Sequence, residues 1–196
     1  MARITKPPEE RRKEFVDTAR DFFIENGYEK TQMIDITKKL NVAAGTIYHY
    51  FKSKTELLYA VIDEETDEKA RKQRHLLSES QGSAYSLLNL IFTAFENDEA
   101  NGNFAVNFTD DPAIIQYYLT KLSNSSIPLF ESLIERGNTD GSWNCEYPLE
   151  TAVFVQQGLA AILSIEKTRK DSPDEKSKRI KVYENFVLRI LDILPR

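Results

Sequence analysis

The sequence predicts an all-α protein of about nine helices: an N-terminal head of three helices, a connecting fourth helix and a C-terminal helical domain. Three observations support this fold class. Almost every segment of the 196 residues repeats its apolar side chains with the period of an α-helix. The alternation typical of a β-strand never persists for more than a few residues. Residues 31–54 form two short helical segments joined by a tight turn, the pattern of a helix-turn-helix.

The first helix is expected to begin at Pro8, because proline is tolerated in a first turn. Glu9 and Glu10 follow it and favour the positive end of the helix dipole. Gly27 can adopt the left-handed backbone that ends a helix. Thr31 is then expected to cap the N-terminus of the second helix with its hydroxyl.

The turn and the third helix carry their own signals. Asn41 can adopt the left-handed conformation that a tight turn requires. Ile47 and Phe51 lie on one face of the third helix and are expected to point inward. Ser53, with Glu56 three residues later, predicts a capping box at the start of the fourth helix.

The head is expected to occupy residues 1–52 and the remaining domain residues 53–196. Residues 63–75 are polar all round, which indicates a solvated or charge-paired connector between the two. Pro128 is acceptable only in the first turn of a helix, so a helix is expected to begin just before it. The helices expected after the connector cover residues 83–97, 111–121, 126–136, 148–170 and 173–194, with a loop at 137–147.

Charge is distributed unevenly along the chain. The net charge of −5 by itself argues against a nucleic-acid partner. However, residues 1–56 hold 11 Lys and Arg against 9 Asp and Glu, whereas residues 57–196 hold 15 against 22. Because phosphates require cations only where they touch the protein, this basic end is compatible with a local DNA contact.

Other classes of protein are disfavoured. No apolar stretch is long enough to span a membrane, and the N-terminus lacks the apolar core of a secretion signal. The single Cys145 excludes a disulfide framework and favours a cytoplasmic protein. The two histidines, His49 and His75, belong to different helices, and no metal-ligand cluster or Gly-rich loop is present. We therefore expect no metal, cofactor or catalytic residue, although a buried carboxylate pair stays open as an alternative.

The third helix presents side chains suited to DNA. Ala44 and Gly45 allow the backbone to approach a phosphate closely, and Thr46 can bond a base edge or a phosphate. Tyr48 carries its hydroxyl on a rigid arm, as does Tyr50. The remaining candidates are His49 and the phosphate anchor Lys54. The alternative is an ordinary helical hairpin with an aromatic surface.

These residues resemble the DNA-binding domain of TetR-family transcriptional regulators, over about residues 10–62. The matching positions are Asp35-Ile36, Val42, Gly45-Thr46-Ile47-Tyr48, Tyr50-Phe51 and Lys52-Ser53-Lys54-Thr55-Glu56-Leu57-Leu58. The resemblance implies a dimeric repressor that binds a palindromic operator in double-stranded DNA and leaves it when a small molecule binds. The DNA contacts that it implies are Thr31, Ala44, Gly45, Thr46, Tyr48, His49, Tyr50 and Lys54. Asn41, Ala43 and Ile34 depart from the common family pattern, and Ala43 offers no capping oxygen to the third helix.

The resemblance also implies an effector pocket in the C-terminal domain and dimerisation through the last two helices. Aromatic and amide side chains are the candidate ligand contacts: Phe92, Phe95, Phe104, Phe108, Tyr117, Tyr118, Phe130, Phe154, Gln156 and Gln157. The acidic domain favours a neutral or cationic apolar effector over a large anionic one. The alternative is a TetR-like DNA-binding protein that has a filled core, no effector and control by protein partners.

The last two helices carry the apolar pattern of an intermolecular four-helix bundle. Residues 153–165 are apolar nearly all round, and the final helix has one apolar stripe. The candidate interface residues are Leu159, Ile162, Leu163, Tyr183, Phe186 and Ile190. An intramolecular core built from the same residues is the alternative.

Overall fold

A computed structural model of the chain describes residues 6–100, 111–169 and 172–192; within these ranges the side chains of 94–100, 163, 165–169, 173 and 176 lie outside the description. The described residues form helices and no strand, which confirms the all-α prediction. The elements are α1 (Pro8–Asn26), α2 (Met33–Lys39), the 3-10 helix η1 (Ala44–His49), α3 (Lys54–Glu79), α4 (Ala84–Ala100), α6 (Pro112–Asp140), α7 (Pro148–Arg169) and α8 (Pro173–Ile190).

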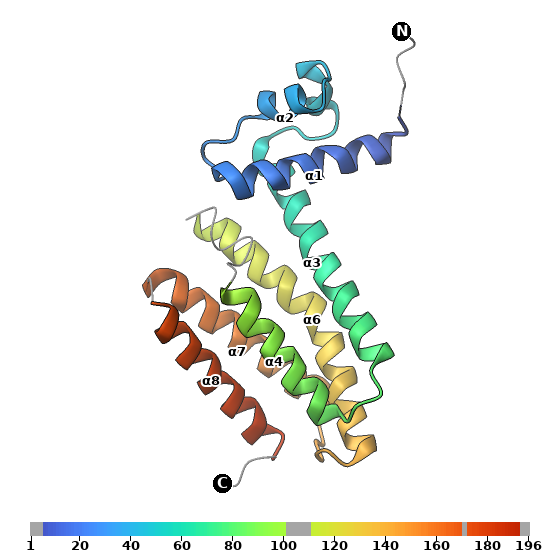
Figure 1. The fold of residues 1–196 in the computed structure, drawn as a ribbon, viewed down its shortest axis with the longest axis vertical. Helices are drawn as coiled ribbons and strands as arrows, with labels where there is room; N and C mark the ends of the chain where they lie inside the picture. The colour runs from blue at the N-terminus through green and yellow to red at the C-terminus, as the bar shows by residue number, and fades with distance from the viewer. Residues whose placement is uncertain (1–5, 101–110, 170–171, 193–196) are drawn as a thin grey trace.

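The helices form a small head above a larger body (Figure 1). α1, α2 and η1 make up the head, and α1 lies across the beginning of α3. α3 then leads away from the head alongside α6 to the far end of the body. α6 also packs against α7 and α4, and α8 packs against both α4 and α7. α3 is therefore the helix that belongs to both parts.

One apolar core joins the head to the body. It contains Phe15 and Phe23 of α1, together with Ile36 and Ile47 from the two helices that follow. The same cluster continues into α3 and α6 through residues Leu57, Leu58, Val61, Ile62, Ile114, Tyr118 and Leu119. The predicted boundary at residues 52 and 53 coincides with the N-cap of α3, but the core crosses it. The head consequently cannot tilt freely on α3.

A second core fills the body. α4, α6, α7 and α8 contribute the buried residues Leu87, Leu88, Phe92, Phe130, Leu133, Ile134, Ala152, Val155, Tyr183, Val187 and Leu191, and Trp143 closes the cluster. Leu159 packs against both cores. Among the described residues, no helix has the length and hydropathy needed to cross a membrane.

Several predicted helix ends are confirmed. Gly27 has φ 82° at the end of α1, and Asn41 has φ 52° in the turn after α2. The Ser53 hydroxyl accepts the Glu56 N–H at 3.0 Å and caps α3 as predicted, but the predicted capping box is incomplete, because the Glu56 carboxylate accepts the N–H of Lys52 at 2.7 Å rather than that of Ser53. At the start of α6, where a helix was expected from residue 111, Asp111 accepts the N–H of Ala113 at 2.9 Å. These ends are determined within one helical turn, which explains why they were predictable.

Thr31 does not cap α2. The helix begins at Met33, and its N-cap residue Gln32 makes no capping bond with its side chain. Thr31 is only 2% exposed, and its hydroxyl donates to the carbonyls of Phe22 at 3.2 Å and Gly27 at 2.9 Å. It holds the end of α1 against the following loop, so it is not available to DNA.

α6 replaces two of the predicted helices. It runs unbroken from Pro112 to Asp140, with Pro128 in its interior, and ends at Gly141 rather than Gly137. An interior proline costs a helix about 3 kcal/mol. The buried face nevertheless continues on both sides of Pro128, because α6 packs against α3, α4 and α7 along its length. Tertiary packing therefore outweighs the local signal.

Candidate DNA-binding surface and effector cavity

The predicted third helix is the short 3-10 helix η1. Its N-cap residue Ala43 has no side-chain oxygen, and the turn is closed instead by the Thr46 N–H donating to the Ala43 carbonyl at 2.8 Å. Ile47 and Phe51 are fully buried and hold η1 against the head, as predicted. Short 3-10 segments are common where a helix lacks good caps, because their bonds close over three residues.

η1 exposes four of the eight residues that were predicted to contact DNA. Tyr48 is 55% exposed, and Ala44, Gly45 and His49 are exposed beside it. Thr46 is half-buried. Tyr50 differs from these, because its ring packs on the head core, 5.5 Å from the ring of Phe15.

Lys54 is half-buried, and its side chain turns back onto the head. Its ammonium donates to the backbone carbonyls of Tyr28 at 2.8 Å, Thr31 at 3.2 Å and Glu29 at 3.3 Å. The same ammonium lies 4.2 Å from the centre of the Tyr28 ring. All of its hydrogen-bonding capacity is used within the protein. Lys54 therefore ties the start of α3 to the loop before α2, and the structure does not support its predicted role as a phosphate anchor.

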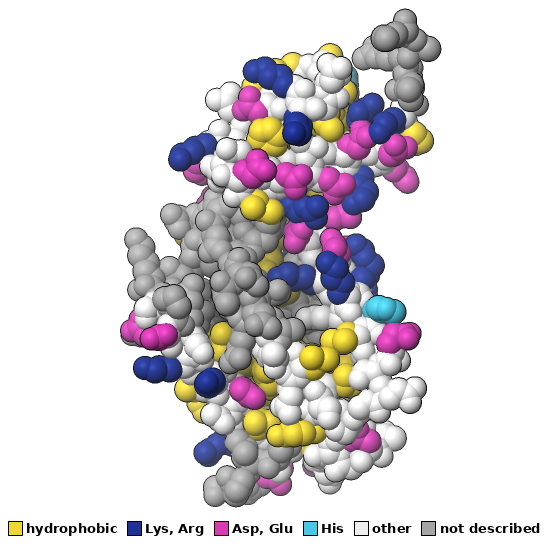
Figure 2. Space-filling model, viewed as in Figure 1, with side chains coloured by type: hydrophobic (Ala, Val, Ile, Leu, Met, Phe, Trp, Pro, Cys, Tyr) yellow, Lys and Arg dark blue, Asp and Glu magenta, His cyan; other side chains and the backbone are white. Residues whose placement is uncertain are grey.

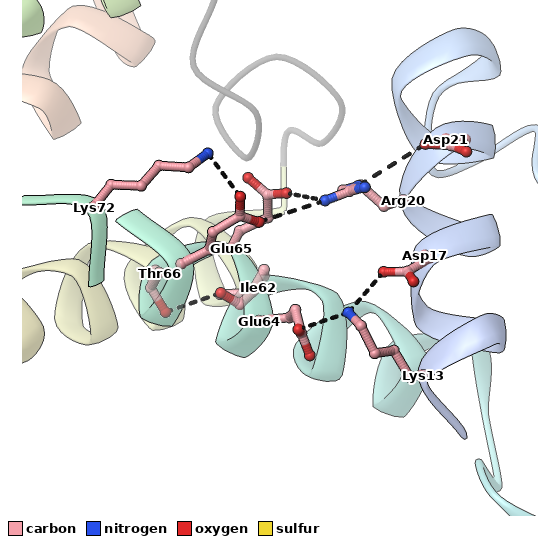
Figure 3. Close-up of polar contacts among 10 residues, drawn as sticks. Lys13, Asp17, Arg20, Asp21, Ile62, Glu64, Glu65, Thr66 and Lys72 are labelled. Atoms are coloured by element: carbon pink, nitrogen blue, oxygen red, sulfur yellow. Dashed lines mark hydrogen bonds and ion pairs between the residues drawn. The ribbon is translucent and has the colours of Figure 1, made fainter. Parts of the chain in front are cut away.

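Ion pairs join α1 to the connector helix α3 (Figure 3). Lys13 lies 2.9 Å from Glu64, and Arg20 lies 3.0 Å from Glu65 and 3.9 Å from Glu68. The hydrogen bond to Glu64 raises the pKa of Lys13, which keeps this ammonium charged. Each exposed pair contributes only about 0.2–1 kcal/mol to stability. Their main effect is on orientation, because two points along α1 are held to α3.

A third junction ties α3 to α6. Asp63 accepts a hydrogen bond from the Tyr117 hydroxyl at 2.9 Å and lies 2.8 Å from the ammonium of Lys121. Burial, together with the bond to Asp63, raises the pKa of Tyr117, so its hydroxyl stays protonated and donates. The Tyr117 ring lies 4.4 Å from the ring of Tyr59. Residues 63–68 of α3 are thus ion-paired to α1 and to α6, which is the charge-paired one of the two alternatives that the sequence allowed for residues 63–75.

The body contains a cavity of about 120 Å³ among five helices. Its described walls are mainly apolar and are formed by Gln73, Leu76, Ile91, Phe92, Leu122, Ser126, Leu129, Phe130, Gln156, Leu159 and Tyr183. Gln73 and Leu76 belong to α3, so the connector helix forms one wall. Three of the predicted ligand contacts therefore line the cavity: Phe92, Phe130 and Gln156.

The other predicted ligand contacts lie elsewhere. Tyr117 serves the Asp63 junction, and Tyr118 is buried in the core shared with the head. Phe154 is 69% exposed, and Gln157 is exposed beside a separate shallow pocket. Phe104, Phe108 and the side chain of Phe95 lie outside the described residues. Aromatic content alone could not indicate which side of each helix faces the cavity.

An apolar surface runs along the outside of α7 and α8. On α8, Val182, Phe186 and Ile190 are exposed at intervals of four residues, and α7 adds the exposed Leu149, Val153 and Phe154. We call these six residues the α7–α8 face. In the view of Figure 2, oppositely charged side chains intermingle over the head and its junction with the body, while hydrophobic side chains form patches on the body.

Only part of the predicted dimer interface lies on the α7–α8 face. Phe186 and Ile190 belong to it, whereas Leu159 and Ile162 are half-buried against the cores. Tyr183 is buried, and its hydroxyl donates to the Val155 carbonyl at 3.1 Å, so it belongs to the intramolecular core. The predicted Leu163 has its side chain outside the described residues.

Comparison with known proteins shows the family of the head. Residues 15–61 match the sequence model of bacterial regulatory proteins of the tetR family. A curated relative, the HTH-type transcriptional repressor KstR2 of Rhodococcus jostii, is 26% identical over 76% of this chain and 79% of its own length. The chain belongs to the TetR family. It is accordingly a DNA-binding transcriptional regulator, as the motif around η1 predicted.

Solved structures of TetR-family proteins share the fold of the whole chain. A regulator from Pectobacterium atrosepticum has a TM-score of 0.79 at 20% identity and covers 96% of this chain and 97% of its own. FadR from Bacillus subtilis, solved with stearoyl-CoA, has a TM-score of 0.60 at 19% identity and covers 93% of this chain and 99% of its own. The body beyond residue 61 therefore shares the fold of these proteins at low sequence identity.

Some residues of the TetR-type surfaces escaped the sequence reasoning. Lys38 and Lys39 are exposed in the last turn of α2, and Lys52 is exposed just after η1. Their position beside the motif makes these exposed lysines further candidates for phosphate contacts. By contrast, Gln73 and Leu122 of the cavity carry no local signal, because their positions depend on how α3 crosses α6.

Proposed function

We propose that the protein is a dimeric repressor whose two heads bind a palindromic operator and release it when a small apolar molecule enters the body cavity. The observation that carries this proposal is the exposed η1 surface on a head that shares its core with α3 and α6. A rigid reading element is required because half-sites lie about 34–36 Å apart on one face of the duplex. Operator binding also implies action in the cytoplasm and no catalytic role.

The proposed DNA contacts are centred on η1. Ala44 and Gly45 let the backbone approach a phosphate, while Thr46 and His49 offer hydrogen-bonding groups to base edges or phosphates. Tyr48 is the largest exposed side chain of this element, and its hydroxyl can bond a phosphate. The exposed lysines of α2 supply positive charge beside it. Tyr50 contributes at most its hydroxyl, since its ring is used in packing.

Coupling between cavity and head is proposed to pass through α3. Gln73 and Leu76 form one wall of the cavity, and the same helix is paired through Glu64 and Glu65 to α1. A ligand that fits better when α3 is displaced would also displace α1 and η1. Only such a difference in affinity between two states can drive release. The presence of the cavity favours this scheme over control by protein partners alone, which requires a filled body.

Dimerisation is proposed to use the α7–α8 face. Six exposed apolar side chains on two adjacent helices are unusual for a monomer, because burying apolar surface is favourable. A two-fold axis would pack this face on its copy as a four-helix bundle. FadR of Bacillus subtilis, which shares the fold, was solved with stearoyl-CoA, a ligand that combines a long apolar chain with an anionic coenzyme part.

Tyr48→Ala tests the DNA-binding surface. We expect affinity for DNA upstream of the gene to fall at least about tenfold, the equivalent of about 1.4 kcal/mol, because an exposed contact is lost. The melting temperature should not change, since the Tyr48 ring packs little. The measurement is a gel-shift titration beside thermal unfolding. Tyr85→Ala, which removes an exposed tyrosine of α4, is the matched control. If Tyr48→Ala and wild type bind DNA with equal affinity, the proposed DNA-binding surface is wrong.

Phe186→Asp tests the α7–α8 face. A carboxylate at a side chain that is 57% exposed costs the monomer little, but it would be buried without a partner in the dimer. We expect wild type to sediment as a dimer and the variant as a monomer that binds the operator weakly. Leu90→Asp, an equivalent change on exposed α4, should remain dimeric. Analytical ultracentrifugation measures the oligomeric state of both variants, and a dimeric Phe186→Asp would contradict the proposed interface.

A further inference from the structure

The cavity walls bear on the chemical class of the effector. Among the described lining residues none is charged, and the polar ones are Gln73, Ser126, Gln156 and Tyr183. A charged ligand group would lose its hydration on entering and would meet no opposite charge on these walls. The Tyr183 hydroxyl already donates to the Val155 carbonyl, and burial raises its pKa, so it stays neutral.

Gln156 is the exceptional polar residue of this cavity. It is 5% exposed, and its side-chain amide makes no hydrogen bond with any residue that the structure describes. An amide offers both a donating NH2 group and an accepting oxygen, so a ligand carbonyl or hydroxyl can satisfy it.

Cavity size limits the ligand further. The volume is about 120 Å³. An apolar cavity of about 150 Å³ in another protein holds benzene. The available space therefore corresponds to about one ring.

From these observations we infer that the effector is a neutral, apolar molecule of about one ring that carries a carbonyl or hydroxyl group, and that Gln156 selects this group. The inference rests on the proposed effector role of the cavity. Gln156 is a specificity-determining residue in this view: the apolar walls supply affinity for any ring of suitable size, and the amide distinguishes among rings.

Three probes of similar size test the inference on the full chain: ethylbenzene, acetophenone and benzoate. NMR titration should give wild type a dissociation constant for acetophenone about tenfold lower than for ethylbenzene, the ratio that one well-placed hydrogen bond supplies. Benzoate, which is charged at neutral pH, should not bind measurably. Gln156→Met, which keeps the length of the side chain but removes its amide, should bind acetophenone and ethylbenzene within about twofold of each other.

Gln157→Met is the matched control, because this neighbouring glutamine is exposed and does not line the cavity. It should keep the wild-type preference for acetophenone. Equal binding of acetophenone and ethylbenzene by wild type, tight binding of benzoate, or a preference that survives in Gln156→Met would overturn the ligand class alone. Binding of none of the probes by wild type would overturn the effector role of the cavity and this inference with it, while leaving the DNA-binding surface untouched.

Discussion

Gly137→Ala is expected to unfold the body at a much lower temperature than wild type. Gly137 lies inside α6, and a Cβ atom built on it would overlap the Cε2 atom of the Trp143 indole. The overlapping atom belongs to a buried ring whose Nε1 donates to the Ile134 carbonyl at 2.9 Å. The ring must therefore leave its site, which costs about 3–5 kcal/mol for an aromatic side chain.

A loss of that size lowers the melting temperature by about 10 °C in a chain of this length. Trp143 is the single tryptophan of the sequence, so its fluorescence reports its displacement directly. We expect a red-shifted emission together with the lower melting temperature. Gly158→Ala is the control, because a Cβ atom at Gly158 meets nothing within 4 Å. It should be neutral or stabilising by up to about 1 kcal/mol. Unchanged emission and melting in Gly137→Ala would show that the indole packing is described wrongly.

Lys54→Ala is expected to weaken the head and to abolish operator binding as a consequence. Removing the ammonium deprives the carbonyls of Tyr28, Glu29 and Thr31 of a charged donor. A hydrogen bond to a charged group contributes about 1.5–3 kcal/mol to stability. The loop before α2 therefore loses its main contact with α3. η1 packs on α2, so a displacement of this loop also displaces η1.

Lys52→Ala separates this structural role from a simple loss of charge. Lys52 is exposed, and no hydrogen bond of its ammonium to another described residue is present. Its replacement should leave the melting temperature unchanged, lower DNA affinity only a few-fold and reduce the salt dependence of binding by about one phosphate contact per head. Lys54→Ala should instead lower the melting temperature. If both variants lose affinity equally and melt like wild type, Lys54 acts as a phosphate contact after all.

The head was largely predictable because its signals are local. Gly27, Asn41 and Ser53 mark backbone turns that depend on the residue itself and on one neighbouring turn. The inward positions of Ile47 and Phe51 follow from helical spacing. Lys54 could not be assigned in this way, because an ammonium at the start of a helix can serve a phosphate or backbone carbonyls equally well. The choice depends on where the loop at residues 28–31 returns in space.

The helices of the body could be predicted from the sequence, but the direction in which their side chains point could not. The apolar stripe of α8 was predicted as one surface, yet Tyr183 and Val187 face the core while Val182 and Phe186 face outward. The residues of so wide a stripe can pack against two different neighbouring elements. Periodicity alone does not show which residues contact which neighbour.

The sequence by itself determined the helical class, several of the helix ends and the TetR-type reading element, because each depends on contacts within a few residues. Only the tertiary structure decided that α6 continues through Pro128, that Gln156 rather than Gln157 lines the cavity, and that Lys54 fastens the head from within. These outcomes depend on how helices far apart in the chain cross one another. Burial at such crossings contributes more free energy than the local preferences that it overrides.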